Sequence, residues 1–263
     1  MRRYVFAAAL LAFAAPALAA PQDDLRALMD EHYQWLLREN PVQATALGVR
    51  EYDNRINDLS EAARRRSIEQ AQAFLTRLDR IPTTELTPAD RVNHAILRRT
   101  LVEAIESDRL PQRNMLFTTY YGWHQGFAGL ANNLPFRTRA DYDSYLTRIE
   151  QYPMLNDEAL RITGEAIRSG HTLPCSVLAG SENSISGVIV EDPTRSRFYQ
   201  PFAGERPAAI PAADWTQLQE RARRIITNVI NPAYAKHLDF YRTQYLPRCA
   251  RSDSVSAQPQ GRE

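Results

Sequence analysis

The stretch LTPADRVNHAILRRTL, residues 86–101, carries the start signal that recurs along this chain and decides its fold class. Thr87 is predicted to be an N-cap, Pro88 the first helical residue and Asp90 the third. The cap oxygen accepts a hydrogen bond from a free N–H of the first turn, and a proline at the first position has no N–H to satisfy. The stretch therefore predicts a helix that begins at Pro88.

Similar signals recur along the chain. Thr138 and Asp141 repeat the cap, Asn40-Pro41 ends an earlier helix, and Gly170 fits the position just after another. Further helices are predicted at 60–81, 153–169, 212–230 and 233–246, the last two separated at Asn231-Pro232. Because strand-like alternation is confined to residues 188–190, we predict an all-α array of seven to nine amphipathic helices.

The N-terminal residues indicate export. Arg2 and Arg3 precede an apolar run at residues 5–15, and Ala17-Leu18-Ala19 offers the small residues that signal peptidase requires. The run is shorter than the roughly 20 apolar residues that a spanning helix needs, which argues against a membrane anchor. We predict a signal peptide at 1–19, cleavage after Ala19, a periplasmic location and no membrane insertion of the mature chain.

The charge balance bears on the binding partners of the chain, and its two cysteines bear on disulfide formation. The chain has 32 Lys and Arg against 31 Asp and Glu, and so balanced a surface argues against a nucleic-acid partner. In an oxidising compartment Cys175 and Cys249 either form a disulfide or remain separate thiols, and the sequence leaves both open.

Local catalytic and metal-binding patterns are absent from the sequence. No two of its five histidines lie one helical turn apart with a glutamate beside the first, as zinc peptidases require. Asp90 and His94 lie four residues apart on a predicted helix, but one such pair of side chains supplies too few ligands for a metal. There is also no Gly-x-Ser-x-Gly elbow. We therefore predict no catalytic residue, no metal ligand and no cofactor for this chain.

One irregular stretch is unusually aromatic. It contains Tyr120, Tyr121, Trp123 and His124 around a single glycine. Aromatic side chains beside glycine in a loop can line a ligand cleft, so these four are the candidate ligand contacts. The alternative is that they plug the end of a helical bundle.

Three stretches carry a family resemblance: ENPVQATALGV at 39–49, LPFRTRADYDSYLTRIEQYP at 134–153 and RIITNVINPAYAKHLDFYRTQYLPRCA at 224–250. Together they resemble the N-terminal half of the bacterial family called domain of unknown function 885 (DUF885). Its members are mostly helical, often exported and metallopeptidase-like. The resemblance implies half of a larger helical cleft, with peptides or modified peptides as partners.

Members of that family are roughly twice as long, and their metal-binding His-Glu and Pro-Gly-His lie in the second half. Nothing in this sequence matches those motifs, so the resemblance transfers no catalytic or metal residue and implies zinc only in a full-length member.

This comparison suggests three segments: the signal peptide, a helical domain at 20–250, and residues 251–263 as a tail or the truncated beginning of a second half. The resulting hypothesis is a catalytically incomplete part of an exported zinc-dependent peptidase-like hydrolase. The alternative is a complete periplasmic ligand- or protein-binding module without enzymatic activity. An incomplete protein is expected to leave the apolar faces of its last helices uncovered, namely Ile225, Ile226, Val229, Tyr241 and Tyr245.

Overall fold

The computed structural model describes residues 20–118 and 120–262, so the predicted signal peptide lies outside the described residues. Within these ranges the chain is helical, with only two isolated β-bridges, and the all-α prediction is confirmed. Seven of the described α-helices have ten or more residues. The helices are α1 (Pro21–Glu39), α2 (Pro41–Ala46), α3 (Glu61–Leu78), α4 (Pro88–Arg109), α5 (Trp123–Ala128), α6 (Arg139–Glu150), α7 (Tyr152–Arg168), α8 (Asn183–Ser186), α9 (Gln200–Ala203), α10 (Ala212–Ile225) and α11 (Asn231–Phe240).

The helix caps predicted from the sequence form as expected. The Thr87 hydroxyl accepts a hydrogen bond from the Asp90 N–H at 3.1 Å, so α4 begins where its sequence indicates. At the head of α6, Thr138 and Asp141 form a reciprocal capping box. Gly170 ends α7 with a φ of 78°, a left-handed conformation that glycine adopts without a steric penalty.

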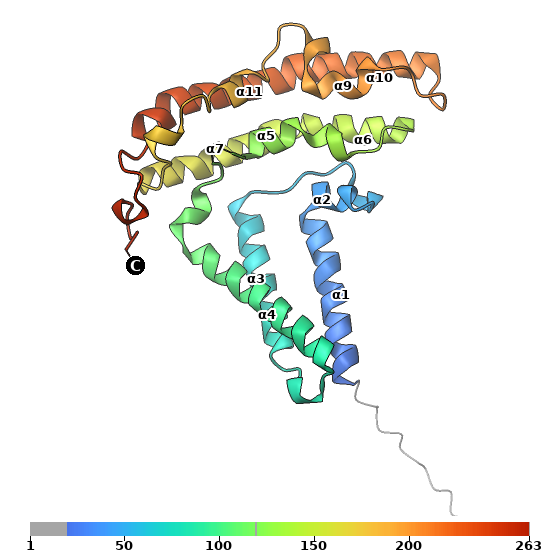
Figure 1. Ribbon diagram of the computed structural model, residues 1–263. Coiled ribbons are helices and arrows are strands. Elements are labelled where there is room, and N and C mark those ends of the chain that lie inside the picture. The colour runs from blue at the N-terminus through green and yellow to red at the C-terminus, as the bar shows by residue number, and fades with distance from the viewer. Residues whose placement is uncertain (1–19, 119, 263) are drawn as a thin grey trace, which may run out of the picture.

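The helices form two stacked rows and a projecting frame (Figure 1). α10 and α11 lie over the row that contains α6 and α7, and the largest apolar core lies between these two rows. On the other side of the α6–α7 row, α1 and the hairpin of α3 and α4 project away and share a second core. Their far ends meet where the Gln22 amide donates to the Glu85 carbonyl at 2.7 Å. The frame is therefore narrow at its tip and wide where it joins the rows.

Arg148 joins the frame to the rows. It extends from α6, is completely buried, and donates hydrogen bonds to the carbonyls of Pro41, Tyr52 and Arg55 at 2.8 to 2.9 Å. It also donates to the Thr45 hydroxyl. One guanidinium thus satisfies several carbonyl groups of the segment that follows α1.

The prediction of two separate helices around Asn231-Pro232 was wrong. α10 passes through a π-helical turn at Ile226–Ile230 directly into α11, and a second π-turn follows at Tyr241–Tyr245. Pro232 lies within this continuous path and has no N–H to donate to the preceding turn. The wider turn before it lets the helical path continue.

The apolar faces of the last helices are covered, contrary to what is expected of an incomplete protein. Ile225, Ile226, Tyr241 and Tyr245 are all buried, and Val229 packs against the same core. The long α10–α11 row lies along α6 and α7, which supply the apolar surface that covers it.

Cys175 and Cys249 form a disulfide in this structure, with their Cα atoms 5.1 Å apart. It lies beside a short bridge between Pro174 and Ala250, where the Cys175 N–H donates to the Ala250 carbonyl at 2.8 Å. The disulfide thus holds the segment after the last helix against the segment that follows α7. No helix among the described residues combines the length and apolar character needed to cross a bilayer.

Candidate functional site

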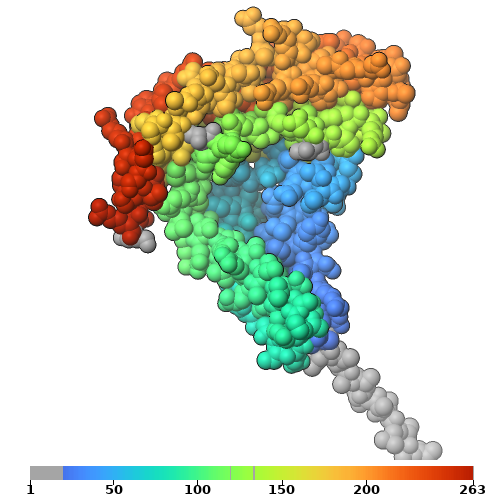
Figure 2. Space-filling model, in the orientation of Figure 1, coloured from blue at the N-terminus to red at the C-terminus, as the bar shows by residue number. Residues whose placement is uncertain are grey.

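The wide end of the frame encloses a cavity of about 490 Å³. Figure 2 shows the hollow between α1, drawn in blue, and the green end of α4. Its walls come from the C-terminal part of α1, the segment before α3, α3 itself, the C-terminal part of α4 and the turn after it, with Ile162 of α7 closing one side. The cavity exists because the three frame helices pack tightly near their shared tip and diverge toward the rows.

The middle of the cavity is apolar. Apolar side chains line it from all three frame helices, among them Trp35, Leu36, Ile68 and Leu101. Trp35 belongs to an aromatic group with His32 and Phe74, whose rings lie 5.2 to 5.8 Å apart. Burial of His32 lowers its pKa below the ordinary value. This group fixes the wall on the α1 side.

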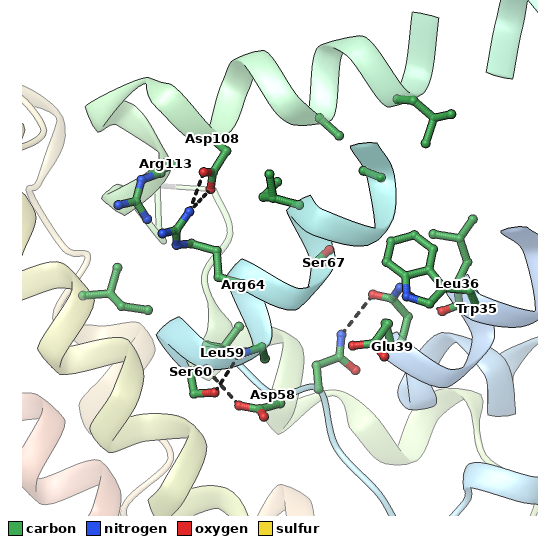
Figure 3. Close-up of a pocket in the computed structure, with 18 of the residues that line it drawn as sticks. Trp35, Leu36, Glu39, Asp58, Leu59, Ser60, Arg64, Ser67, Asp108 and Arg113 are labelled. Atoms are coloured by element: carbon green, nitrogen blue, oxygen red, sulfur yellow. Dashed lines mark hydrogen bonds and ion pairs between the residues drawn. The ribbon is translucent and has the colours of Figure 1, made fainter. Parts of the chain in front are cut away.

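Two arginines lie at the end formed by α3, α4 and the following turn (Figure 3). Arg64 is bound by the carboxylates of Glu61 and Asp108, and the hydrogen bonds to these two groups raise its pKa. The same contact with Arg64 lowers the pKa of Glu61 to about 2. Arg113 lies beside this network, is exposed, and has no carboxylate within ion-pair distance among the described residues. It is therefore the arginine whose N–H donors are available to a ligand.

The opposite end is rich in hydrogen-bond acceptors. The Asn40 amide donates to the Leu36 carbonyl at 2.9 Å, which leaves the Asn40 side-chain oxygen as an acceptor. The Asn57 amide donates to that oxygen at 3.3 Å. The Asn57 Oδ1 atom is then buried without a partner among the described residues. Glu39, exposed and likewise without an ion pair in the described part of the chain, lies at the same end (Figure 3).

Asn114 supplies a second unsatisfied oxygen. Its side chain is only 9% exposed and lines the cavity next to Arg113, yet its Oδ1 atom has no hydrogen-bond partner in the described ranges. Buried amide oxygens are normally bonded, so Asn57 and Asn114 each leave one acceptor unused in the wall of this cavity. In residues 20–118 and 120–262 no three His, Cys, Asp or Glu side chains are grouped closely enough to hold a metal ion.

The four predicted ligand contacts lie elsewhere and are divided between surface and interior. Tyr120 and Tyr121 are 91% and 63% exposed, whereas His124 is buried and Trp123 is half-buried. Trp123 donates to the Asn156 side chain at 3.1 Å and stacks on His237 at 4.5 Å. None of the four lines the cavity of the frame.

His124 and His237 instead form a buried polar cluster between the rows. Their rings are 4.9 Å apart, and the His124 Nε2 atom contacts the Ser184 hydroxyl at 2.9 Å. Because that hydroxyl donates to the Ser181 carbonyl, Nε2 of His124 carries the proton and Nδ1 is a bare acceptor. The Nδ1 atoms of both histidines are buried without a partner in the part of the chain that the structure describes.

These two histidines make the fold sensitive to acid. Burial lowers the pKa of His124 to about 4, and burial together with the neighbouring His124 lowers the pKa of His237 to about 3. In the unfolded chain both titrate near ~6.5. The folded protein therefore binds fewer protons, and its stability is complete above about pH 6.5 and is lost as the pH falls toward the folded values.

We expect about 2 kcal/mol to be lost per histidine between roughly pH 6.5 and 5. Urea unfolding at several pH values measures this slope. His124→Gln and His237→Gln should each flatten it, and slopes equal to that of the unaltered protein would contradict the assignment.

Sequence reasoning missed the cavity residues Glu39, Asn57, Arg113 and Asn114. Glu39 opens the family stretch at 39–49, but nothing in that stretch indicates a cavity, and the four residues come from three separate segments of the chain. The only related signal was the Asn40-Pro41 helix stop, which places Asn40 at the cavity without indicating its partners.

Comparison with known proteins gives a family and a fold. The sequence model of a family described as "Bacterial protein of unknown function (DUF885)" matches residues 41–263. None of the curated proteins matches the chain. Among solved structures, the crystal structure of a Colwellia psychrerythraea protein assigned as a lipoprotein is similar, with a TM-score of 0.78 at 14% identity. The similarity covers 93% of this chain and 44% of that one, so this chain spans less than half of that structure.

Proposed function

The chain belongs to the DUF885 family of bacterial proteins, and from this premise we propose that it forms the helical N-terminal part of an exported, zinc-dependent, peptidase-like hydrolase. In this proposal the described residues supply a ligand-binding cavity, and the zinc site and catalytic groups belong to the second half of a longer protein.

The observation that carries the proposal is the frame cavity. It has a volume typical of small-molecule sites, apolar walls, charged groups at its ends and buried amide oxygens without partners. Such a site binds a ligand but lacks an obvious group to activate water. The solved structure, of which this chain spans 44%, supports a role as one part of a longer protein.

Three features support export. Residues 1–19 have the composition of a signal peptide, and the structure contains a disulfide, which persists mainly in oxidising compartments. The Colwellia psychrerythraea relative is assigned as a lipoprotein, a class of exported protein.

A periplasmic binding module is the second candidate. It is favoured by the covered apolar faces of α10 and α11, because this chain alone buries them. In that case the same cavity binds its ligand and no hydrolysis follows.

Metal content and hydrolysis distinguish the two candidates. We expect purified residues 20–263 to contain no stoichiometric zinc and to cleave no fluorogenic peptide. The longer Colwellia psychrerythraea relative should contain zinc and lose peptide hydrolysis on treatment with a chelator. One tightly bound zinc in residues 20–263, or a relative that neither holds zinc nor cleaves peptides, would contradict the proposed hydrolase.

A further inference from the structure

We propose that the frame cavity binds a short zwitterionic molecule of the peptide type, with its amine toward Glu39 and its carboxylate toward Arg113. The inference rests on the proposed role of this cavity as a ligand site and names the chemical class of the ligand. It follows from the two chemically opposite ends of the cavity and from the apolar walls between them.

The end beside α1 selects a hydrogen-bond donor. The orientation of the Asn57 side chain is fixed by Asn40. The Asn40 side-chain nitrogen donates to the Leu36 carbonyl, so the Asn40 side-chain oxygen accepts from the Asn57 side-chain nitrogen. The remaining Asn57 oxygen can only accept, and Glu39 adds a negative charge at the same end. Trp35 offers an aromatic face on this wall, which also favours a cation. An ammonium group meets all three conditions.

The end beside α4 selects an anion. Arg64 and Arg65 pair with the carboxylates of Glu61 and Asp108, two positive charges against two negative ones. The excess positive charge at this end therefore belongs to Arg113. A guanidinium with unused N–H donors binds a carboxylate in a bidentate manner. Asn114, the next residue in the chain, also lines the cavity, and its side-chain oxygen could accept from a donor such as a backbone amide.

The remaining charged group of the cavity, Asp58, does not oppose the arrangement of a negative end at Glu39 and a positive end at Arg113. Asp58 accepts from the Ser60 N–H at 2.8 Å and lies 3.7 Å from Arg66, so its charge is partly neutralised. Between the ends, Ile68, Ala104 and Leu116 give the walls an apolar surface. A volume of about 490 Å³ admits a ligand the size of a few amino acids and excludes a folded partner.

Titration calorimetry on residues 20–263 tests the proposal with the tripeptide alanyl-leucyl-alanine and three derivatives: N-acetylated, C-amidated and blocked at both ends. The free peptide is expected to bind, each single block to weaken binding at least tenfold, and the double block to abolish it. Equal affinity for all four peptides, or no detectable binding of the free peptide at millimolar concentration, would overturn the proposal.

Charge variants assign each end of the ligand. Arg113→Gln should weaken binding of the free peptide and leave the C-amidated peptide unaffected, and Glu39→Gln should do the same for the N-acetylated peptide. Both side chains are exposed, so the helical circular dichroism should not change. Arg109→Gln and Glu69→Gln, exposed charges outside the cavity, serve as matched controls and should bind normally. If either cavity variant weakens the free, the N-acetylated and the C-amidated peptide equally, the assigned direction is wrong.

The peptide-binding experiment and the test of the proposed hydrolase can fail independently of each other. Binding is measured on this chain without zinc, so a relative that lacks metal-dependent hydrolysis leaves the result intact. Conversely, a tripeptide that fails to bind defeats the ligand class and leaves the hydrolysis experiment unaffected.

Discussion

Arg148→Met is expected to lower the free energy of unfolding by about 3–5 kcal/mol, the usual cost of removing one partner from a buried polar network. Arg148 is completely buried, and burial lowers its pKa to about 10, which still leaves it charged at neutral pH. Its charge-assisted hydrogen bonds satisfy the carbonyls of Pro41, Tyr52 and Arg55. Methionine fills much of the volume but donates to none of these carbonyls. The Pro41 and Tyr52 carbonyls keep the Thr45 hydroxyl and the Arg55 N–H as donors, whereas the Arg55 carbonyl loses the guanidinium donor.

Urea unfolding followed by circular dichroism measures this loss. Arg148→Lys should recover little of it, because one ammonium group cannot reproduce the fork of donors that reaches several carbonyls. Arg139→Met is the matched control on the same helix. Arg139 is half-exposed and pairs with Asp214, so a loss below about 1 kcal/mol is expected. Similar losses for the two methionine variants would show that Arg148 does not join the frame to the rows.

Removal of the disulfide is expected to cost roughly 4 kcal/mol. The bond between Cys175 and Cys249 closes a loop with a sequence separation of 74 residues. In the chain-entropy model a cross-link over such a loop destabilises the unfolded state by ~4.5 kcal/mol, near the upper end of measured values. The segment that it holds is also fastened by the Ala250 N–H, which donates to the Leu173 carbonyl at 2.9 Å.

Two measurements check this expectation. The oxidised protein should show no free thiol under denaturing conditions, and a reducing agent should shift its urea midpoint to that of the Cys175→Ser, Cys249→Ser double variant. The double variant itself should not respond to the reducing agent. Two titratable thiols in the purified, unreduced protein would refute the bridge.

The helix boundaries that depend on neighbouring residues could be read from the sequence. The Thr87 and Asp90 cap and the Thr138 and Asp141 box each involve residues three positions apart, so their partners are already present in the local sequence. Gly170 is equally local, because its left-handed conformation follows from the end of α7. These signals and the helical spacing of apolar residues were sufficient for the fold class.

The site could not be predicted in the same way. Trp123 and His124 are adjacent in sequence to Tyr120 and Tyr121, and that proximity suggested a common cleft. The bridge between Phe117 and Gly122 turns the chain just before α5, which leaves the two tyrosines outside and carries the other pair inward. The turn needs glycine, since a Cβ atom at position 122 would lie 2.9 Å from the Phe117 Cβ.

The sequence alone therefore determined that the chain is helical and where most helices begin and end, because capping and helical spacing act over about four residues. The tertiary structure alone decided that Glu39, Asn57 and Arg113 surround one cavity and that Arg148 is buried among distant carbonyls. These arrangements depend on how the frame helices diverge and pack against the α6–α7 row. Such packing is set by burial between segments far apart in the chain, which no local pattern encodes.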